Sequence, residues 1–225
     1  MITSAANPRL KLVRKLESRR QREKLGLFVC EGEDLVDAAR AAGIEPVDLL
    51  VAGESVAPKL LADVSTLAHP PRVIGVFRRD DLPGFEQRPV SLALWHVADP
   101  GNVGTLIRTA DAFGASVGLS NGCGDPTGPK ALRASAGAIF RVRIGRFDEP
   151  AGRRVALVAR EGTPLAELEP AESAVFVLGA EREGLSDEMV ASCDEVASIP
   201  TAPSAESLNV AVAGAIALYE WSRRV

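Results

Sequence analysis

Three short segments of the chain combine polar side chains with glycine, and each follows an apolar run typical of a buried strand. The first holds Asn102 and Arg108, the second holds Glu181 between two glycines, and the third is Ser207-Leu208-Asn209. Amide, guanidinium, carboxylate and hydroxyl groups that converge on one place can position a substrate and stabilise developing charge. Taken alone, Ser204 or Ser207 could simply cap the last helix. The three segments together favour a reactive site.

The residues around these segments predict strands that alternate with helices. Strands are expected at 92–97, 117–119, 155–158 and 175–178, and helices at 103–113, 129–136 and 187–193. This alternation predicts an α/β fold with a mainly parallel sheet. Ligands of such sheets bind beyond the carboxyl ends of the strands. Asn102, Glu181 and Ser207 all fall there.

The front of the chain predicts a second, smaller α/β domain. One helix is expected from Asn7-Pro8 to Gly26, followed by strands at 27–30, 47–51 and 73–77 and helices at 33–42 and 58–64. Residues 80–89 carry two prolines, a glycine and charges, which is typical of a linker. We therefore expect domains at 1–85 and 86–225.

The charge of the chain is unevenly distributed. Its net charge of −4 does not indicate a nucleic-acid-binding protein, yet residues 9–24 contain eight lysines and arginines and two glutamates. Such a segment could be a solvated helix face. A surplus of positive charge on one short segment also suits contacts to phosphate groups, and we expect it to bind RNA.

Several other classes of protein are disfavoured by the composition. The two histidines, His69 and His96, lie far apart and have no neighbouring ligands at metal-binding spacing, so we expect no metal. The three cysteines lack C-x-x-C spacing, which predicts free thiols. There is no apolar run of about 18 residues and no apolar core of a signal peptide near Met1, so we expect no membrane association and a cytoplasmic location.

The main competing class is a dehydrogenase or methyltransferase of the Rossmann type. Its glycine loop has the pattern G-x-G-x-x-G, and in the nearest candidate, Gly122 to Gly128, the third glycine comes one place late. No acidic residue follows about 20 residues later, where such enzymes bind ribose. A phosphate-binding P-loop is also absent from the sequence.

The joint pattern of the three segments resembles a known family. N-x-G-x(3)-R at 102–108, G-x-E-x-x-G at 179–184 and S-L-N at 207–209 are similar to the three motifs of the SpoU (TrmH-type) RNA 2′-O-ribose methyltransferases of the SPOUT superfamily. The resemblance is close from residue 90 onward and looser before it. It implies an α/β knot fold, in which the C-terminal segment forms a deep trefoil knot, preceded by a smaller RNA-binding domain.

The resemblance also implies a reaction. Members of the family transfer a methyl group from S-adenosyl-L-methionine to the 2′-hydroxyl of a ribose in structured RNA. The front of the chain resembles the ribosomal-protein-like domain of members that modify ribosomal RNA, which makes ribosomal RNA the expected substrate. A tRNA substrate and a non-catalytic RNA-binding knot protein are the alternatives. TAPSA at 201–205 departs from the commonest family pattern, which bears on the shape of the cofactor loop.

By resemblance, each motif residue has an expected role. The cofactor would be held by Leu178, Gly179, Ile199 and Leu208, and the catalytic set would be Asn102, Arg108, Glu181, Ser207 and Asn209. Some proposals for the family make the arginine a general base. A guanidinium stays protonated in proteins and donates hydrogen bonds. We therefore expect Arg108 to bind the target phosphate and to stabilise the developing alkoxide.

The last helix, expected at 208–223, is apolar nearly all round and must be buried on most sides. Members of the family pair as homodimers through this region, and we expect the same here. Ala213, Gly214 and Ala217 are small enough to let a second backbone approach closely.

Overall fold

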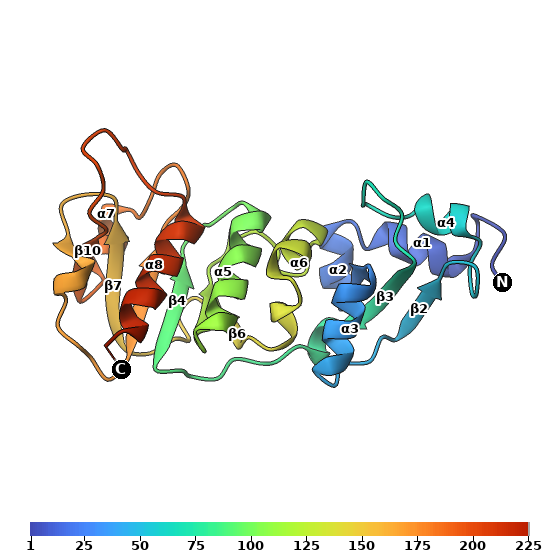
Figure 1. Cartoon of the computed structure of the whole chain (residues 1–225), viewed down its shortest axis with the longest axis horizontal. Helices are drawn as coiled ribbons and strands as arrows, with labels where there is room; N and C mark the ends of the chain where they lie inside the picture. Colours follow the sequence, from blue (N-terminus) through green and yellow to red (C-terminus); the bar gives the residue numbers. More distant parts are fainter. Residues whose placement is uncertain (225) are drawn as a thin grey trace.

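The computed structural model describes residues 1–224, which form an elongated molecule with the N-terminus at one end and the last helix, α8, near the other (Figure 1). It contains two sheets. A three-stranded sheet has the order β1-β3-β2, and a seven-stranded sheet has the order β6-β5-β4-β9-β7-β10-β8. The predicted boundary between residues 85 and 86 falls between the two sheets and stays a prediction.

The first sheet is antiparallel and carries the basic helices at the front of the chain. Its elements are α1 (Pro8–Lys15), α2 (Arg19–Leu25), β1 (Leu27–Glu31), α3 (Glu33–Ala41), β2 (Asp48–Val51), α4 (Pro58–Ala62) and β3 (Val73–Arg78), followed by the 3-10 turn η1 (Arg79–Asp81). The single helix expected before Gly26 is wrong. The chain breaks between α1 and α2, where the guanidinium of Arg22 binds the carbonyl oxygens of Leu16 and Glu17.

The second sheet is parallel throughout the strand pairs that the structure describes. Its elements are β4 (Val90–Leu94), α5 (Pro100–Ala112), β5 (Ser116–Leu119), α6 (Pro129–Ser135), η2 (Ala138–Phe140), β6 (Ile144–Arg146), β7 (Arg153–Val158), β8 (Thr163–Pro164), η3 (Leu165–Glu167), β9 (Ala174–Leu178), α7 (Asp187–Ala191), β10 (Glu195–Ser198) and α8 (Val210–Ser222). The predicted α/β class and parallel sheet are confirmed. The short strands β6, β8 and β10 were not predicted, and the expected trefoil knot stays a prediction.

Helices α5 and α8 cover one face of the parallel sheet and lie side by side (Figure 1). Gly214 of α8 makes this packing possible, because a Cβ atom there would lie 2.4 Å from Leu106 and 3.0 Å from Leu178. On the opposite face, Val175 and Val177 pack with Met189 of α7. The parallel strands β4 and β9 therefore end side by side between the helix pair α5 and α8 on one face and α7 on the other. The first motif follows β4 in the sequence, and the second follows β9.

The two sheets share one apolar core. Phe28 of β1 and Phe77 of β3 stack with ring centroids 5.8 Å apart, and Phe140 of η2 lies 6.3 Å from Phe28 and 5.8 Å from Phe77. Gly137, with a φ of 84°, lets the chain approach Ala38 of α3, since a Cβ atom at Gly137 would lie 2.5 Å from the Ala38 Cβ. The parts of the chain before and after the linker are therefore packed directly against each other.

Candidate active site

The first motif lies at the start of α5. Asp99 caps this helix, because its Oδ1 atom accepts hydrogen bonds from the backbone N–H groups of Gly101 (2.6 Å) and Asn102 (3.3 Å). Its other oxygen pairs with Lys130 of α6 at 2.7 Å. The helix thus begins at Pro100, three residues before the predicted start. The whole stretch from Asn102 to Arg108 is helical.

The motif glycine Gly104 has a packing role. A Cβ atom at this position would lie 2.3 Å from the carbonyl oxygen of Ala131 and 2.7 Å from the Cβ of Ala134, both in α6. Glycine is therefore needed for α5 and α6 to lie in direct contact. This contact also places Lys130 beside Asp99.

The carboxylate of Glu181 joins the second motif to the first. It accepts hydrogen bonds from the backbone N–H groups of Ala98 (3.2 Å) and Asp99 (3.0 Å) and from the side-chain amide of Asn102 (3.0 Å). Burial raises the pKa of the Glu181 carboxyl, but these hydrogen bonds together outweigh it and the pKa lies below its ordinary value. Glu181 is thus held as a carboxylate that fixes the orientation of Asn102.

The third motif joins the same network through Asn209. Its side-chain nitrogen donates to the Oδ1 atom of Asn102 at 3.1 Å. Its oxygen caps α8 by accepting from the backbone N–H groups of Ala211 (2.9 Å) and Val212 (3.3 Å). The suggestion that Ser204 or Ser207 caps the last helix is wrong. One chain of hydrogen bonds therefore connects the N-termini of α5 and α8 to Glu181.

A cleft of about 650 Å³ opens beside this network. Its lining includes all four residues expected to hold the cofactor, Leu178, Gly179, Ile199 and Leu208, and also Glu181, Ser207 and Asn209. The peptide groups of Ser207 and Leu208 form no backbone hydrogen bond with any other of residues 1–224. Apolar walls with a few free polar groups are typical of a site for a small organic ligand, and these residues fit the adenosine and amino-acid parts of S-adenosylmethionine.

Family models match both parts of the chain. The model described as the SpoU rRNA Methylase family matches residues 89–219, and the model described as the MRM3-like substrate binding domain matches residues 7–77. The chain belongs to the SpoU rRNA methylase family. The family and the enzyme class expected from the three motifs are therefore confirmed.

Known SpoU relatives resemble the chain over its whole length. The 23S rRNA (guanosine(2553)-2′-O)-methyltransferase RlmP of Bacillus subtilis is 32% identical, over 97% of this chain and 97% of that protein. A solved structure of an rRNA methyltransferase from Sinorhizobium meliloti with bound AdoMet has a TM-score of 0.88 and 29% identity, covering 100% of this chain and 97% of that one. The SpoU methyltransferase AviRb of Streptomyces viridochromogenes, also with AdoMet, has a TM-score of 0.84 and 26% identity, covering 97% and 98%. These relatives support the expected cofactor, S-adenosylmethionine.

Two of the predicted SpoU site residues stand apart from the network. The side chains of Arg108 and Ser207 are exposed, and neither has a hydrogen-bond partner within residues 1–224. Ser207 lines the cleft, whereas Arg108, on α5, does not. The structure thus brings together Asn102, Glu181 and Asn209 within one chain and leaves Arg108 free to meet another group.

Sequence reasoning missed Asp99 and Lys130 as parts of the SpoU site. An acidic residue directly before proline is a common start of a helix, so Asp99-Pro100 contained a usable signal. Lys130 had no such signal, because it reaches Asp99 only through the packing of α6 on α5. Among residues 1–224 there is no cluster of possible metal ligands, and no helix there has the length and apolar character needed to cross a membrane.

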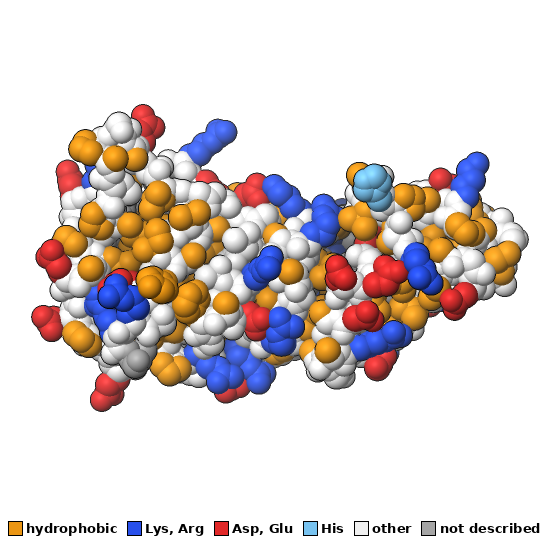
Figure 2. Space-filling view, in the orientation of Figure 1, with side chains coloured by type: hydrophobic (Ala, Val, Ile, Leu, Met, Phe, Trp, Pro, Cys, Tyr) orange, Lys and Arg blue, Asp and Glu red, His pale blue; other side chains and the backbone are white. Residues whose placement is uncertain are grey.

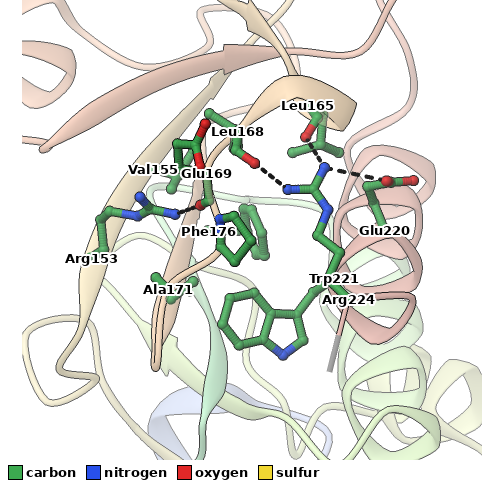
Figure 3. Close-up of a pocket in the computed structure, with 12 residues that line it drawn as sticks. Arg153, Val155, Leu165, Leu168, Glu169, Ala171, Phe176, Glu220, Trp221 and Arg224 are labelled. Carbon is green, nitrogen blue, oxygen red and sulfur yellow. Dashed lines mark hydrogen bonds and ion pairs between the residues drawn. The ribbon is translucent and has the colours of Figure 1, made fainter.

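A second hollow lies at the other end of α8 (Figure 3). Arg224 donates to the carbonyl oxygens of Leu168 (2.6 Å) and Leu165 (2.8 Å) and pairs with Glu220 at 3.3 Å, while Trp221 closes one side. This hollow has a volume of about 30 Å³, which is enough for a water molecule or two. The larger cleft is therefore the candidate cofactor site.

Proposed function

We propose that this chain transfers a methyl group from S-adenosylmethionine to the 2′-hydroxyl of a ribose in ribosomal RNA, and that it acts as a homodimer. The observation that carries the proposal is the network of Glu181, Asn102 and Asn209 at the mouth of the cleft. The RNA is taken to be ribosomal because the B. subtilis relative is named for that substrate. This substrate implies that the reaction takes place in the cytoplasm.

The residues of the cleft have distinct tasks in this proposal. Leu178, Ile199 and Leu208 supply apolar surface for the adenine, and free peptide groups at 207–208 supply hydrogen bonds. When bound, the cofactor supplies a methyl group on a positively charged sulfur. Ser207, exposed beside Asn209, is free to hydrogen-bond the ligand or the target hydroxyl. Asn102 is held in one orientation by its two bonds and positions the ribose.

Arg108 acts on the RNA in this proposal. A guanidinium group is a permanent cation in proteins, so Arg108 binds the phosphate next to the target nucleotide and stabilises the negative charge that develops on the 2′-oxygen as the hydroxyl proton passes to solvent water. Because Arg108 does not line the cleft of its own chain, a dimer in which α5 of one copy faces the cleft of the other would complete the site.

The outer face of α8 supports the homodimer. Val212 is 47% exposed and Tyr219 is 55% exposed, and Figure 2 shows hydrophobic side chains gathered over this helix. An apolar helix face of this kind is typical of a protein–protein interface. The expectation that Gly214 and Ala217 lie in the interface is wrong, because both are buried inside the chain. A second copy would instead cover Val212, Ile216 and Tyr219.

The variant Arg108→Ala tests the proposed function. It should lower turnover with ribosomal RNA and labelled cofactor by about 100-fold or more, the size of effect typical for loss of one charge-stabilising donor. Calorimetry should show cofactor affinity within about twofold of wild type, since Arg108 lies outside the cleft. Arg72→Ala, which removes another exposed arginine, is the control and should leave both values unchanged.

Three results would contradict the proposal. Substantial turnover by Arg108→Ala at saturating RNA removes this residue from the mechanism. A wild-type chain that does not bind S-adenosylmethionine supports the alternative of a non-catalytic RNA-binding protein. Methylation of tRNA in preference to ribosomal RNA supports the other alternative.

A further inference from the structure

Arg22 lies in the basic segment at the front of the chain, yet its side chain is only 5% exposed. Its Nε and Nη2 atoms both bind Oδ2 of Asp125, at 2.9 and 2.8 Å. Its Nη1 atom donates to the carbonyl oxygens of Leu16 (2.8 Å) and Glu17 (2.7 Å). The guanidinium is thus fully engaged inside the protein and is not available to a phosphate group.

Asp125 is the partner of Arg22 and belongs to the loop between β5 and α6. Its side chain is 6% exposed, and its Oδ1 atom accepts hydrogen bonds from the backbone N–H (2.9 Å) and the hydroxyl (2.7 Å) of Thr127. Arg79 provides a second positive charge, with its Nη2 atom 3.9 Å from Oδ1. Both members of the pair are therefore buried with their hydrogen bonds satisfied.

On its N-terminal side the pair fixes the break between α1 and α2. Arg22 is part of α2, and it binds the carbonyl groups of Leu16 and Glu17, which directly follow α1. The two helices carry exposed cations with no ion-pair or hydrogen-bond partner within residues 1–224: Lys11, Lys15, Arg20 and Lys24. Arg22 therefore helps to determine how these four charged side chains are placed relative to the parallel sheet.

On its C-terminal side the pair holds a loop that touches the catalytic network. Next to Asp125, Gly124 donates its backbone N–H to the carbonyl oxygen of Val97 at 2.9 Å. A Cβ atom at Gly124 would lie 2.9 Å from Pro100 and 3.1 Å from the carbonyl oxygen of Ala98. Ala98 in turn donates its N–H to Glu181. Only a few covalent and hydrogen bonds thus separate Arg22 from Glu181.

A buried ion pair of this kind is weak evidence for a contribution to stability, because removing two charges from water costs about as much as their attraction returns. Replacement of such a pair by apolar residues is often neutral. The best-attested use of a buried pair is to fix one arrangement among several of similar energy. The rest of the interface between the first sheet and the parallel sheet is mainly apolar, as at Phe28 and Phe140. Its other directional contacts include the more exposed hydrogen bonds from Arg19 to the carbonyl oxygen of Cys123 and from Arg133 to Thr66.

We propose that Arg22 and Asp125 are positioning residues for methyl transfer. This role rests on the proposed function. The pair sets the position of the basic helices α1 and α2 relative to the start of α5. RNA bound by these helices then presents its target ribose to Asn102 and Arg108. The pair acts through the loop at 120–128 and touches neither the RNA nor the cofactor.

The double variant Arg22→Met with Asp125→Leu tests this role, because it keeps the buried volume and removes the directional bonds. With wild-type turnover established first, the single-turnover rate at saturating RNA and cofactor should fall at least tenfold. The KM for RNA, the affinity for S-adenosylmethionine and the melting temperature should stay close to wild type. The control is Arg141→Met with Asp111→Leu, which removes an Arg–Asp pair at the C-terminal end of α5, away from the site, and it should keep the wild-type rate.

Two outcomes would overturn the proposal. One is a folded double variant that keeps the wild-type single-turnover rate. The other is a loss of rate that is matched by a loss of cofactor affinity and a large fall in melting temperature, which would mean a purely structural role. If the double variant does not fold, Arg22→Lys replaces it, since lysine keeps the charge but cannot bind Asp125 and both carbonyl groups together. Its rate should fall severalfold, and an unchanged rate overturns the proposal. An inactive wild-type chain would instead count against the proposed function.

Discussion

Replacing Gly104 with alanine should destabilise the protein although alanine is the better helix former. The new Cβ atom would lie 2.3 Å from the carbonyl oxygen of Ala131, whereas close approaches between carbon and oxygen are normally about 3.3 Å or more. Helices α5 and α6 must therefore separate by about 1 Å. The obstacle is backbone, which no change of side-chain rotamer can relieve.

The expected size of the effect follows from two opposing contributions. Overpacking of a core costs about 1–3 kcal/mol, and the rigid backbone obstacle puts this site at the upper end. The gain in helix propensity from glycine to alanine returns about 1 kcal/mol. The free energy of unfolding should thus fall by about 2 kcal/mol. For a chain of this size that corresponds to a melting temperature about 4–8 °C lower.

Differential scanning calorimetry of three variants would measure this effect. Gly214→Ala is the matched control, because its Cβ would meet the end of the flexible Leu106 side chain at 2.4 Å and should cost less. Adding Ala134→Gly to Gly104→Ala should recover only part of the stability, since it relieves the clash with Ala134 and not the one with Ala131. A Gly104→Ala variant that melts at or above the wild-type temperature would refute the reasoning.

Three further predictions concern the RNA, the site and the dimer. Alanine at the four exposed cations of α1 and α2 (Lys11, Lys15, Arg20 and Lys24) should flatten the dependence of RNA affinity on salt in binding titrations, by about 0.7–0.9 in logarithmic slope for each phosphate group that is no longer bound. An unchanged slope means that these helices do not bind RNA. Asn209→Ala should lower the free energy of unfolding by about 1 kcal/mol or more, since it removes a helix cap and the bond to Asn102, whereas Ser207→Ala should leave it unchanged in urea titrations. Equal effects of the two changes would contradict the assigned cap. Val212→Arg should convert the proposed homodimer to a monomer in analytical ultracentrifugation. A variant that stays dimeric would place the interface away from the outer face of α8, and a wild-type chain that is monomeric would refute the proposed homodimer.

Much of the fold could be predicted from the sequence because its signals are local. The apolar run that forms β9 and the alternation of strands and helices around it are read within windows of a few residues. A general property of parallel sheets, whose ligand sites lie at the carboxyl ends of the strands, also placed Asn102, Glu181 and Ser207 near one another. Asn102 and Glu181 do meet, and in the third motif the residue that joins them is Asn209.

The predictions that proved wrong depend on contacts between residues far apart in the sequence, or on a choice between two residues that cap a helix equally well. The break between α1 and α2 depends on Asp125, which lies 103 positions from Arg22. Serine and asparagine are about equally good helix caps, so the choice of Asn209 over Ser207 is made by its bond to Asn102. The short strand β6 has too few residues to show an alternating pattern. The inward position of Ala217 could not be read from a helix that is apolar on all sides.

The place of β9 in the sheet has a consequence for the synthesis of the protein on the ribosome. β9 pairs with β4 on one side and with β7 on the other, so the central strand of this part of the sheet is made after both of its neighbours. Until residue 178 has left the ribosome, the edges of β4 and β7 have free backbone groups that no other strand of this sheet covers. A chain that grows at about 5–20 residues per second keeps such edges open for seconds. Nascent SpoU chains of this type are therefore expected to be most prone to aggregation, and most dependent on chaperones, during the interval between the appearance of β4 and that of β9.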